Sequence, residues 1–503
     1  MVEVVNTVKK DKKAAAQKQA HDQSGSGKLY AARRKVYPKA VSGKFRRMKS
    51  IIAFIALAVF FITPWLRWDR GPGLPDQAVL IDLAHRRFYI FWIEIWPQEF
   101  YYVAALLIMA GIGLFILTAM FGRAWCGYGC WQTVWTDLFM HVDRLIEGDR
   151  NAQMRLDKAP WTAQKIAKRV IKYAIWAIIA YGTSLTFILY FADAPTLVKQ
   201  VFTGQAPSVA YSTIAIMGTI TLVFAGFMRE QVCIYMCPWP RIQGAMVDED
   251  TLMVTYNDWR GEPRGSKRDH KKHPEISYGD CIDCGLCHAV CPTGIDIRDG
   301  QQLACITCAL CIDACDSVME KIGKPHGLIS YSNLSTYNDH TTGKDVNFTW
   351  RSFIRPRTLV YLTVWTLIGV ALFLHLTFRD RLQINIVHDR NPLFTRLSNG
   401  ELRNGYTVRL LNMQLEPRIF RIRVSGIPGA KMAINGLDKP PATQFEVPVA
   451  GNKARALKIY VTADPARLKP EENELTFSIE ALGKDGSVTE KTQKTTVFAV
   501  PRK

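Results

Sequence analysis

Eight cysteines between residues 281 and 315 have a spacing that points to metal chemistry. They form two runs of the pattern C-x2-C-x2-C-x3-C, the first followed by Pro292 and the second by Asp316. With this pattern, three close thiolates bind one 4Fe-4S cluster, and the last cysteine of the run binds the other cluster. The predicted ligands are Cys281, Cys284, Cys287 and Cys315 for one cluster, and Cys305, Cys308, Cys311 and Cys291 for the other.

Zinc is the alternative occupant of these cysteines. Structural zinc sites need four ligands and commonly use two C-x2-C pairs. That requirement gives no reason for two evenly spaced quartets, so the spacing favours iron–sulfur clusters. Iron–sulfur thiolates also need a reducing compartment, which predicts that this part of the chain faces the cytoplasm.

The remaining four cysteines form two C-x3-C pairs, Cys126 with Cys130 and Cys233 with Cys237. Each pair follows an apolar segment and a Phe-x-Arg sequence, so the chain contains a loose repeat. Thiols four residues apart share one face of a helix, and four thiols at one membrane depth could form a soft-metal site that prefers Cu(I). The alternative is that they are small buried hydrophobic residues. Their repetition beside an electron-transfer module favours the metal site.

Five apolar segments must position these cysteines. Each has close to the ~20 residues that a bilayer span requires, and they comprise residues 51–66, 100–121, 173–191, 209–228 and 359–378. The C-x3-C pairs come directly after the second and fourth segments. Residues 1–50 form a basic tail that is too long for a signal peptide and lacks a cleavage site of small residues, so the first span is expected to be retained.

A formal net charge of +20 is compatible with nucleic-acid binding, but the basic residues lie beside the apolar segments. They collect in residues 1–50, 144–169, 229–272 and 351–357, which would all be cytoplasmic if the N-terminus is inside. The exception is the first outside loop, with Arg67, Arg70, Arg86 and Arg87. The pattern predicts a bacterial inner-membrane protein in contact with lipid and not with nucleic acid. Its N-terminus and ferredoxin segment would be cytoplasmic and its C-terminal segment periplasmic.

Residues 381–503 differ in character from the rest of the chain. Short β-rich runs alternate with Gly, Pro, Asn and Asp turns, at residues 406–411, 419–424, 445–449, 457–462, 475–479 and 495–500. This spacing predicts an antiparallel sandwich of the immunoglobulin or fibronectin type. The segment has no cysteine and no catalytic cluster, so we expect a partner-binding or structural role.

The predicted fold is multi-domain. It combines an α-helical polytopic membrane domain, an inserted bacterial-type two-cluster ferredoxin domain and a C-terminal immunoglobulin-like β-sandwich. The predicted boundaries are 1–50 for the basic cytoplasmic tail, 51–240 for the membrane domain with four spans and both C-x3-C motifs, 241–350 for the ferredoxin domain, 351–380 for the fifth span and 381–503 for the periplasmic domain.

The sequence resembles the CcoG, FixG or RdxA family of cytochrome c oxidase accessory proteins over almost its whole length. The resemblance is carried by Pro64-Trp-Leu-Arg-Trp-Asp, Trp96-Pro-Gln-Glu-Phe-Tyr-Tyr, Gly122-Arg-Ala-Trp-Cys-Gly-Tyr, Met228-Arg-Glu-Gln-Val-Cys, Asp248-Glu-Asp-Thr-Leu and Arg260-Gly-Glu-Pro-Arg-Gly, together with the cysteine runs. In one departure, Trp131 follows Cys130 where the family usually has proline. This departure affects the expected local backbone but not the thiols.

The resemblance implies a role in assembling a cbb(3)-type cytochrome oxidase. Family members look like cytoplasm-facing cupric reductases that convert Cu(II) to Cu(I) for the oxidase, with copper as substrate or bound ion. The implied partners are oxidase assembly factors or a copper chaperone or exporter, and an electron donor that the sequence does not identify. Two alternatives stay open: a quinol-linked membrane ferredoxin that transfers electrons, and a non-catalytic assembly scaffold with structural clusters. Proteins of the first alternative lack a large periplasmic sandwich.

Overall fold

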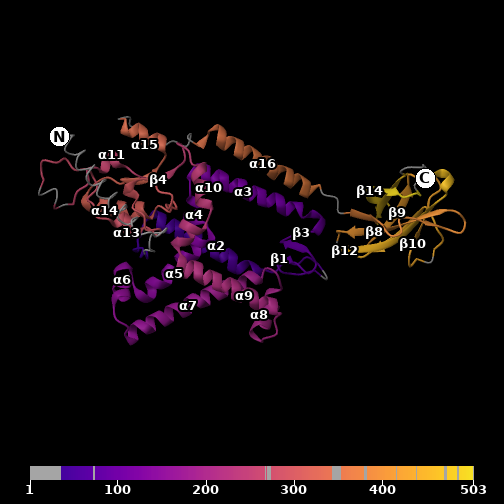
Figure 1. Ribbon diagram of the computed structural model, residues 1–503, viewed down its shortest axis with the longest axis horizontal. Coiled ribbons are helices and arrows are strands. Elements are labelled where there is room, and N and C mark those ends of the chain that lie inside the picture. The colour runs from indigo at the N-terminus through magenta and orange to yellow at the C-terminus, as the bar shows by residue number, and fades with distance from the viewer. Residues whose placement is uncertain are drawn as a thin grey trace, which may run out of the picture. The chain divides into compact units, whose positions relative to one another are not determined.

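The computed structural model describes residues 35–71, 74–266, 268, 273–342, 353–378, 382–414, 416–437, 439–468, 473–483 and 486–501. Most of the basic tail predicted at residues 1–50 therefore lies outside the described residues. The chain forms two compact units that divide between Gly369 and Val370. Helices dominate the first unit and strands the second (Figure 1).

Five helices are long and apolar enough to cross a membrane, and they coincide with the five predicted segments. They are α2 (Lys44–Ile62), α3 (Tyr101–Phe121), α7 (Ala163–Ile188), α9 (Ser208–Thr221) continued by the π-helix η3 (Leu222–Met228), and α16 (Pro356–Thr377). Their apolar side chains are largely exposed, as for Phe373 (68%) and Leu367 (63%) in α16. Helices with this much exposed apolar surface are suited to lipid rather than to water.

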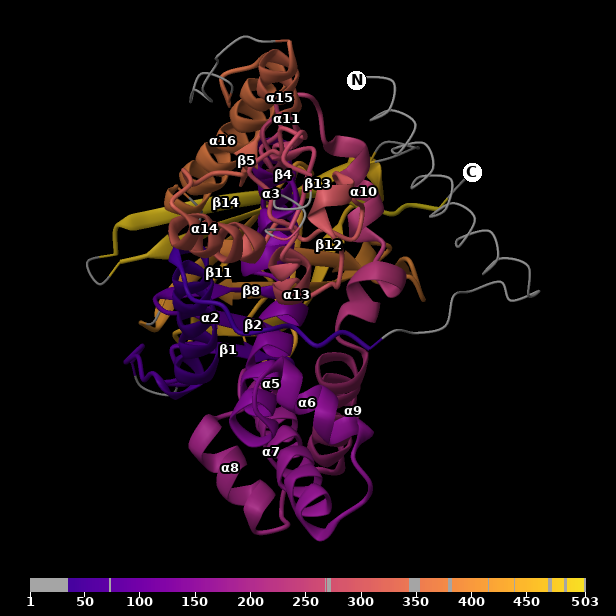
Figure 2. The same cartoon turned by 90° about the vertical axis from the view of Figure 1, so that its left-hand side faces the viewer.

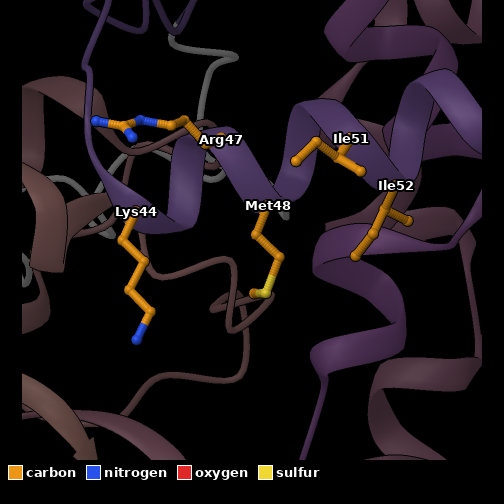
Figure 3. Close-up of a pocket in the computed structure, with 5 residues that line it drawn as sticks. All are labelled: Lys44, Arg47, Met48, Ile51 and Ile52. Atoms are coloured by element: carbon orange, nitrogen blue, oxygen red, sulfur yellow. The ribbon is translucent and has the colours of Figure 1, made fainter.

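The groove at the start of α2 combines cationic and apolar side chains. Figure 3 shows the residues that line it, Lys44, Arg47, Met48, Ile51 and Ile52. The two cationic side chains come first along the helix and the isoleucines follow. This order is expected where a helix passes from a polar surface into hydrocarbon.

Helix α5 (Trp131–Glu147) joins the second and third spans. On its apolar face, Trp135 and Phe139 belong to a buried cluster with Trp176 of α7 and Ala225 of η3. Its polar face carries carboxylates that neutralise cations at the span ends, and the N–O distances are 2.8 Å for Arg46–Asp137, 2.5 Å for Arg229–Asp143 and 2.7 Å for Lys172–Glu147. A charge buried at this interface needs such a partner, so α5 fixes the spans through both packing and charge.

The ferredoxin segment contains β4 (Met253–Tyr256), α13 (Leu286–Val290), α14 (Leu310–Ile322) and β5 (Ile329–Ser332), with β4 and β5 paired antiparallel. It is attached directly to the first span, because the backbone N–H groups of Phe45 and Arg46 donate to the Asp313 carboxylate at 3.1 and 2.7 Å. A carboxylate at a helix N-terminus satisfies free N–H groups and stabilises the helix. Figure 2 shows α14 above α2 at this attachment.

Elements of the first unit gather at opposite ends of the spanning helices (Figure 1). The ferredoxin elements α13, α14 and β4 lie at one end. At the other end lie α8 (Ala194–Phe202) and a three-stranded sheet of β1 (Val79–Asp82), β2 (Arg87–Ile90) and β3 (Ile93–Ile95). The sequence did not predict this sheet, whose strands have only three or four residues.

The second unit is a sandwich of two antiparallel sheets, which confirms the predicted immunoglobulin-like fold. One sheet has the order β10 (Lys431–Ile434), β12 (Lys453–Ala463), β8 (Leu402–Asn412) and β6 (Leu382–His388), with β7 (Thr395–Arg396) beside β8. The other has the order β11 (Gln444–Val449), β9 (Arg418–Ser425), β13 (Asn473–Leu482) and β14 (Val488–Phe498). Tyr406, Phe420 and Phe477 are fully buried between the sheets.

Candidate iron–sulfur and thiol sites

The cysteines of the two runs line two neighbouring cavities. The first cysteine cavity contains Cys281, Cys284, Cys287 and Cys315. The second cysteine cavity contains Cys291, Cys305, Cys308 and Cys311, and Cys287 also reaches its wall. The structure thus places the last cysteine of each run beside the first three cysteines of the other run.

Both runs wrap their cavities with the same backbone conformation. Asp283 and Thr307 have φ values of 51° and 53°, and Gly285 and Ala309 have φ values of 63° and 58°. Residues other than glycine rarely adopt positive φ. Alternating left-handed and right-handed residues turn successive N–H groups toward one anion, as in many iron–sulfur sites. The donor set and the backbone therefore both fit two 4Fe-4S clusters.

Burial makes these thiols weak acids. It raises the pKa of Cys287 to about 11, and the pKa values of Cys308 and Cys315 to about 12. A coordinating metal deprotonates a thiol outright. Cluster assembly in these cavities should therefore release protons, as metal binding to protonated ligands generally does.

Neither C-x3-C pair lies on one continuous α-helix, which differs from the prediction. Cys126 lies in the short helix α4 (Ala124–Tyr128) and Cys233 in the π-helix η4 (Val232–Met236). Cys130 and Cys237 are extended, with φ/ψ of −63°/132° and −76°/124°. Pro238 accounts for the second case, because proline excludes helical conformations from the residue before it. Cys130 is the N-cap residue of α5 and is extended like Cys237, although Trp131 and not a proline follows it. The departure from the family's Cys-Pro sequence therefore does not alter the extended conformation of this cysteine.

The structural repeat begins four residues before each pair. Gly122 ends α3 with φ/ψ of 56°/−121°, and Arg229 ends η3 with 46°/−110°. The backbone repeat therefore pairs Gly122 with Arg229. The Phe-x-Arg sequences would instead pair Arg123 with Arg229, so the two alignments differ by one residue. Positive φ is strained for arginine, and π-helical segments such as η3 and η4 occur often at functional sites.

The four thiols of the two pairs, here named the four-cysteine site, lie close enough to influence one another electrostatically. Burial raises the pKa of Cys233 to about 12, and Cys130, Cys126 and Cys237 contribute to the rise. Cys237 is exposed, so the site is accessible from solvent. Among the residues that the structure describes, no three His, Cys, Asp or Glu side chains are grouped so that they could hold a metal ion.

Gln243 supports the four-cysteine site and was not identified from the sequence. It is completely buried, and its Oε1 atom accepts a hydrogen bond from Cys126 Sγ at 3.2 Å. Its Nε2 atom donates to Thr118 Oγ1 at 3.2 Å. Gln243 therefore holds the Cys126 thiol against the end of α3. A single glutamine in α10 (Trp239–Met246) carries no sequence signal for such a role.

The fold and the cysteine cavities define a membrane-associated iron–sulfur protein with a C-terminal immunoglobulin-like domain. Residues 228–334 match the family model of a 4Fe-4S dicluster domain, and residues 102–147 match that of a 4Fe-4S binding domain. Residues 372–501 match the model of the immunoglobulin-like fold at the C-terminus of FixG.

Relatives over nearly the full length identify the family. The nitrogen fixation protein FixG of Rhizobium meliloti is 52% identical over 469 residues, which cover 89% of this chain and 90% of that protein. Protein RdxA of Cereibacter sphaeroides is 52% identical over 442 residues, covering 87% and 92%. The chain belongs to the FixG/RdxA family. A solved structure of a FixG-related protein from Vibrio parahaemolyticus is 19% identical, with a TM-score of 0.19, and covers 24% of this chain and 99% of its own.

The match at residues 102–147 bears on the four-cysteine site. This segment contains Cys126 and Cys130 as its only cysteines. Two cysteines are too few for a 4Fe-4S cluster, but four from both C-x3-C pairs would suffice. An iron–sulfur cluster is therefore a second candidate occupant, beside copper.

Proposed function

We propose that this chain reduces Cu(II) to Cu(I) at the cytoplasmic face of the bacterial inner membrane, for the assembly of a cbb(3)-type cytochrome c oxidase. The observation that carries the proposal is the contact between the four-cysteine site and the second cysteine cavity. Cys126 packs against the buried cluster that contains Ile306, Cys308 and Leu310. Soft-metal ligands, which prefer Cu(I), are therefore adjacent to an electron-transfer site.

The proposal assigns the iron ligands by the crossed pattern of the two cavities. Cys281, Cys284, Cys287 and Cys315 hold one cluster, and Cys291, Cys305, Cys308 and Cys311 hold the other. When bound, the two clusters supply single-electron transfer. The cavities are lined by apolar side chains such as Val254, Ile297 and Leu328. These side chains exclude water, and solvent exposure is one of the factors that set a cluster's potential.

In the proposed reaction, one Cu(II) accepts one electron and becomes one Cu(I). The electron comes from a low-potential, one-electron carrier of the ferredoxin or flavodoxin class in the cytoplasm. The soft product ion is bound by thiols of Cys126, Cys130, Cys233 and Cys237, which must come closer together to do so, since no three of these described residues are grouped for a metal ion in this structure. The thiols that bind it lose their protons. The ion then passes to an oxidase assembly factor or to a copper chaperone or exporter.

The distribution of charge supports the orientation in this proposal. The ferredoxin end of the spans carries Arg46, Lys172 and Arg229. Two arginines of the opposite end are taken up by the fold: Arg67 contacts Asp76 and Asp193 at 2.6 and 2.8 Å, and Arg70 donates to four backbone carbonyl groups. The positive-inside pattern counts Lys and Arg whether or not they are paired, so the first outside loop stays an exception, and the longer basic segments at the ferredoxin end outweigh it.

Reporter fusions test the orientation. A fusion after Gly204, in the loop between α8 and α9, and one after Lys503 should give a periplasmic signal. A fusion at His273, in the ferredoxin segment, should give a cytoplasmic signal. A periplasmic signal at His273 would exclude a reductase that works in the cytoplasm.

Cluster reoxidation tests the activity. Purified protein reduced with substoichiometric dithionite should be reoxidised by Cu(II), with one Cu(I) captured by a specific chelator for each electron. Reduction of the clusters by a quinol analogue, with no response to Cu(II), would support the membrane ferredoxin alternative. Clusters that respond to neither would indicate a scaffold.

A further inference from the structure

Helix α4 lies between the four-cysteine site and the second cysteine cavity. Gly127 approaches the cavity so closely that an added Cβ atom would lie 2.6 Å from Ile306 O and 3.0 Å from Cys308 Cα. The Tyr128 hydroxyl donates a hydrogen bond to Cys308 O at 3.1 Å. Because Cys126 belongs to the same helical turn, one short segment contacts the wall of one site and supplies a thiol to the other.

Arg123, the residue before α4, is a buried cation that faces both sites. It is 6% exposed, its Nη1 atom donates to Leu303 O, and its Nε atom has no hydrogen-bond partner in the part of the chain that the structure describes. Arg123 lies three residues before Cys126, and Leu303, which accepts its hydrogen bond, lies two residues before Cys305. The guanidinium is therefore placed beside one cysteine of each site.

Two other cations of the first unit already have carboxylate partners. Lys49, which is 2% exposed, has its Nζ atom 3.8 Å from Asp137 Oδ1. Arg229 lies 2.5 Å from Asp143 Oδ2. No carboxylate pairs with Arg123 among the described residues, so its charge is available to the two thiol groups. A buried charge is unfavourable unless opposite charge forms beside it.

We propose that Arg123 and α4 couple the two sites, so that metal binding at the four-cysteine site and the charge state of the second cysteine cavity influence each other. Arg123 is a positioning residue here: it stabilises negative charge on both sides and touches no reacting atom. Negative charge grows in the cavity when an electron arrives, and at the four-cysteine site when thiols lose protons. Such coupling is reciprocal by thermodynamic necessity. It deepens the proposed function, since the electron gained by Cu(II) would cross this segment.

The charge is tested with Arg123→Gln, Arg123→Lys and the exposed control Arg241→Gln. Redox titration monitored by electron paramagnetic resonance (EPR) gives the midpoint potential of each cluster, and competition with a chelator gives the Cu(I) affinity. Arg123→Gln removes positive charge beside Cys305, so the potential of the cluster that Cys305→Ser eliminates should fall. Cu(I) affinity should fall about tenfold or more, as for loss of a charged contact. Arg123→Lys should keep most of the parental midpoint potential and Cu(I) affinity. Arg241→Gln should have the same potential and affinity as the parent.

The packing is tested with Gly127→Ala, which changes no charge. Its control is Gly111→Ala in α3, where an added Cβ atom would meet nothing within 4 Å. Gly127→Ala should push α4 away from the cavity wall, so reoxidation by Cu(II) should slow while the iron content stays at the parental value. Gly111→Ala should be reoxidised at the parental rate.

Each outcome decides the proposal. Unchanged potentials in Arg123→Gln would overturn the coupling, even if copper binding weakened. If Arg123→Gln fails to retain iron, the test is made on the parent protein. Adding Cu(I) should then shift the midpoint potential of the cluster associated with Cys305, and the absence of a shift would overturn the proposal. If the parent binds no copper but Arg123→Gln still lowers that potential, the shared charge is supported and the copper function is rejected instead.

Discussion

Replacing Cys291 by serine is expected to remove the cluster beside Cys305, Cys308 and Cys311 and to spare the cluster beside the other cysteines of its own run. The reason is the grouping of thiols in space, because Cys291 lines the second cysteine cavity. A hydroxyl is a harder and weaker ligand than a thiolate for an iron–sulfur cluster. Iron should therefore fall from about eight to about four atoms per chain, and one of the two EPR signals should disappear.

Cys315→Ser is the matched control, because Cys315 belongs to the second run but lines the cavity of the first run. It should remove the cluster beside Cys281, Cys284 and Cys287, and the signal lost should be the one that Cys291→Ser retains. Loss of the same signal in both variants, or of the cluster on the variant's own run, would show that the crossed assignment is wrong.

Patterns that repeat along the chain were predictable from the sequence. The five spans follow from long apolar runs, because a bilayer demands that length and composition. Six of the strands in the sandwich, β8, β9 and β11 to β14, follow from alternating β-rich runs between turns. Strands β6, β7 and β10 were missed, since β6 closely follows the fifth span and β7 and β10 have only two and four residues.

The features that join the parts of the first unit were not predictable, because they depend on residues far apart in the sequence. Asp313 caps α2, although 268 positions separate it from Phe45. Nothing in the sequence distinguishes Gly127 from other glycines, and its importance follows only from its short distance to Cys308. The spacing of the C-x3-C pairs predicted a common helix face, whereas the extended residue that closes each pair places the thiols differently. Residue type and spacing therefore pointed to the candidate groups, but not to how the two sites touch.

Cys233→Ala combined with Cys237→Ala is expected to abolish copper retention while both iron–sulfur clusters remain. The cavities that hold the other eight cysteines are lined by neither residue, so iron should stay at about eight atoms per chain. Copper should be lost because the four-cysteine site keeps only Cys126 and Cys130, and soft thiolate ligands are what select Cu(I). In cells, oxidase maturation should weaken most when copper is scarce, since the two remaining thiols would bind copper only weakly and mass action compensates for the lost affinity at high copper.

Metal analysis and EPR of the reduced double variant separate the occupants of the four-cysteine site, with Cys126→Ala combined with Cys130→Ala as the matched variant from the other pair. If copper is the occupant, both double variants lose copper and keep parental iron and spectra. If the parent binds about twelve irons and each variant loses about four of them, the four thiols hold a third cluster, as the family match at residues 102–147 allows, and the copper assignment must be withdrawn. Parental copper binding and reduction in both variants would place the copper chemistry elsewhere. The comparison is decisive because the two pairs begin on separate elements, Cys126 in α4 and Cys233 in η4, and only a shared metal requires both pairs.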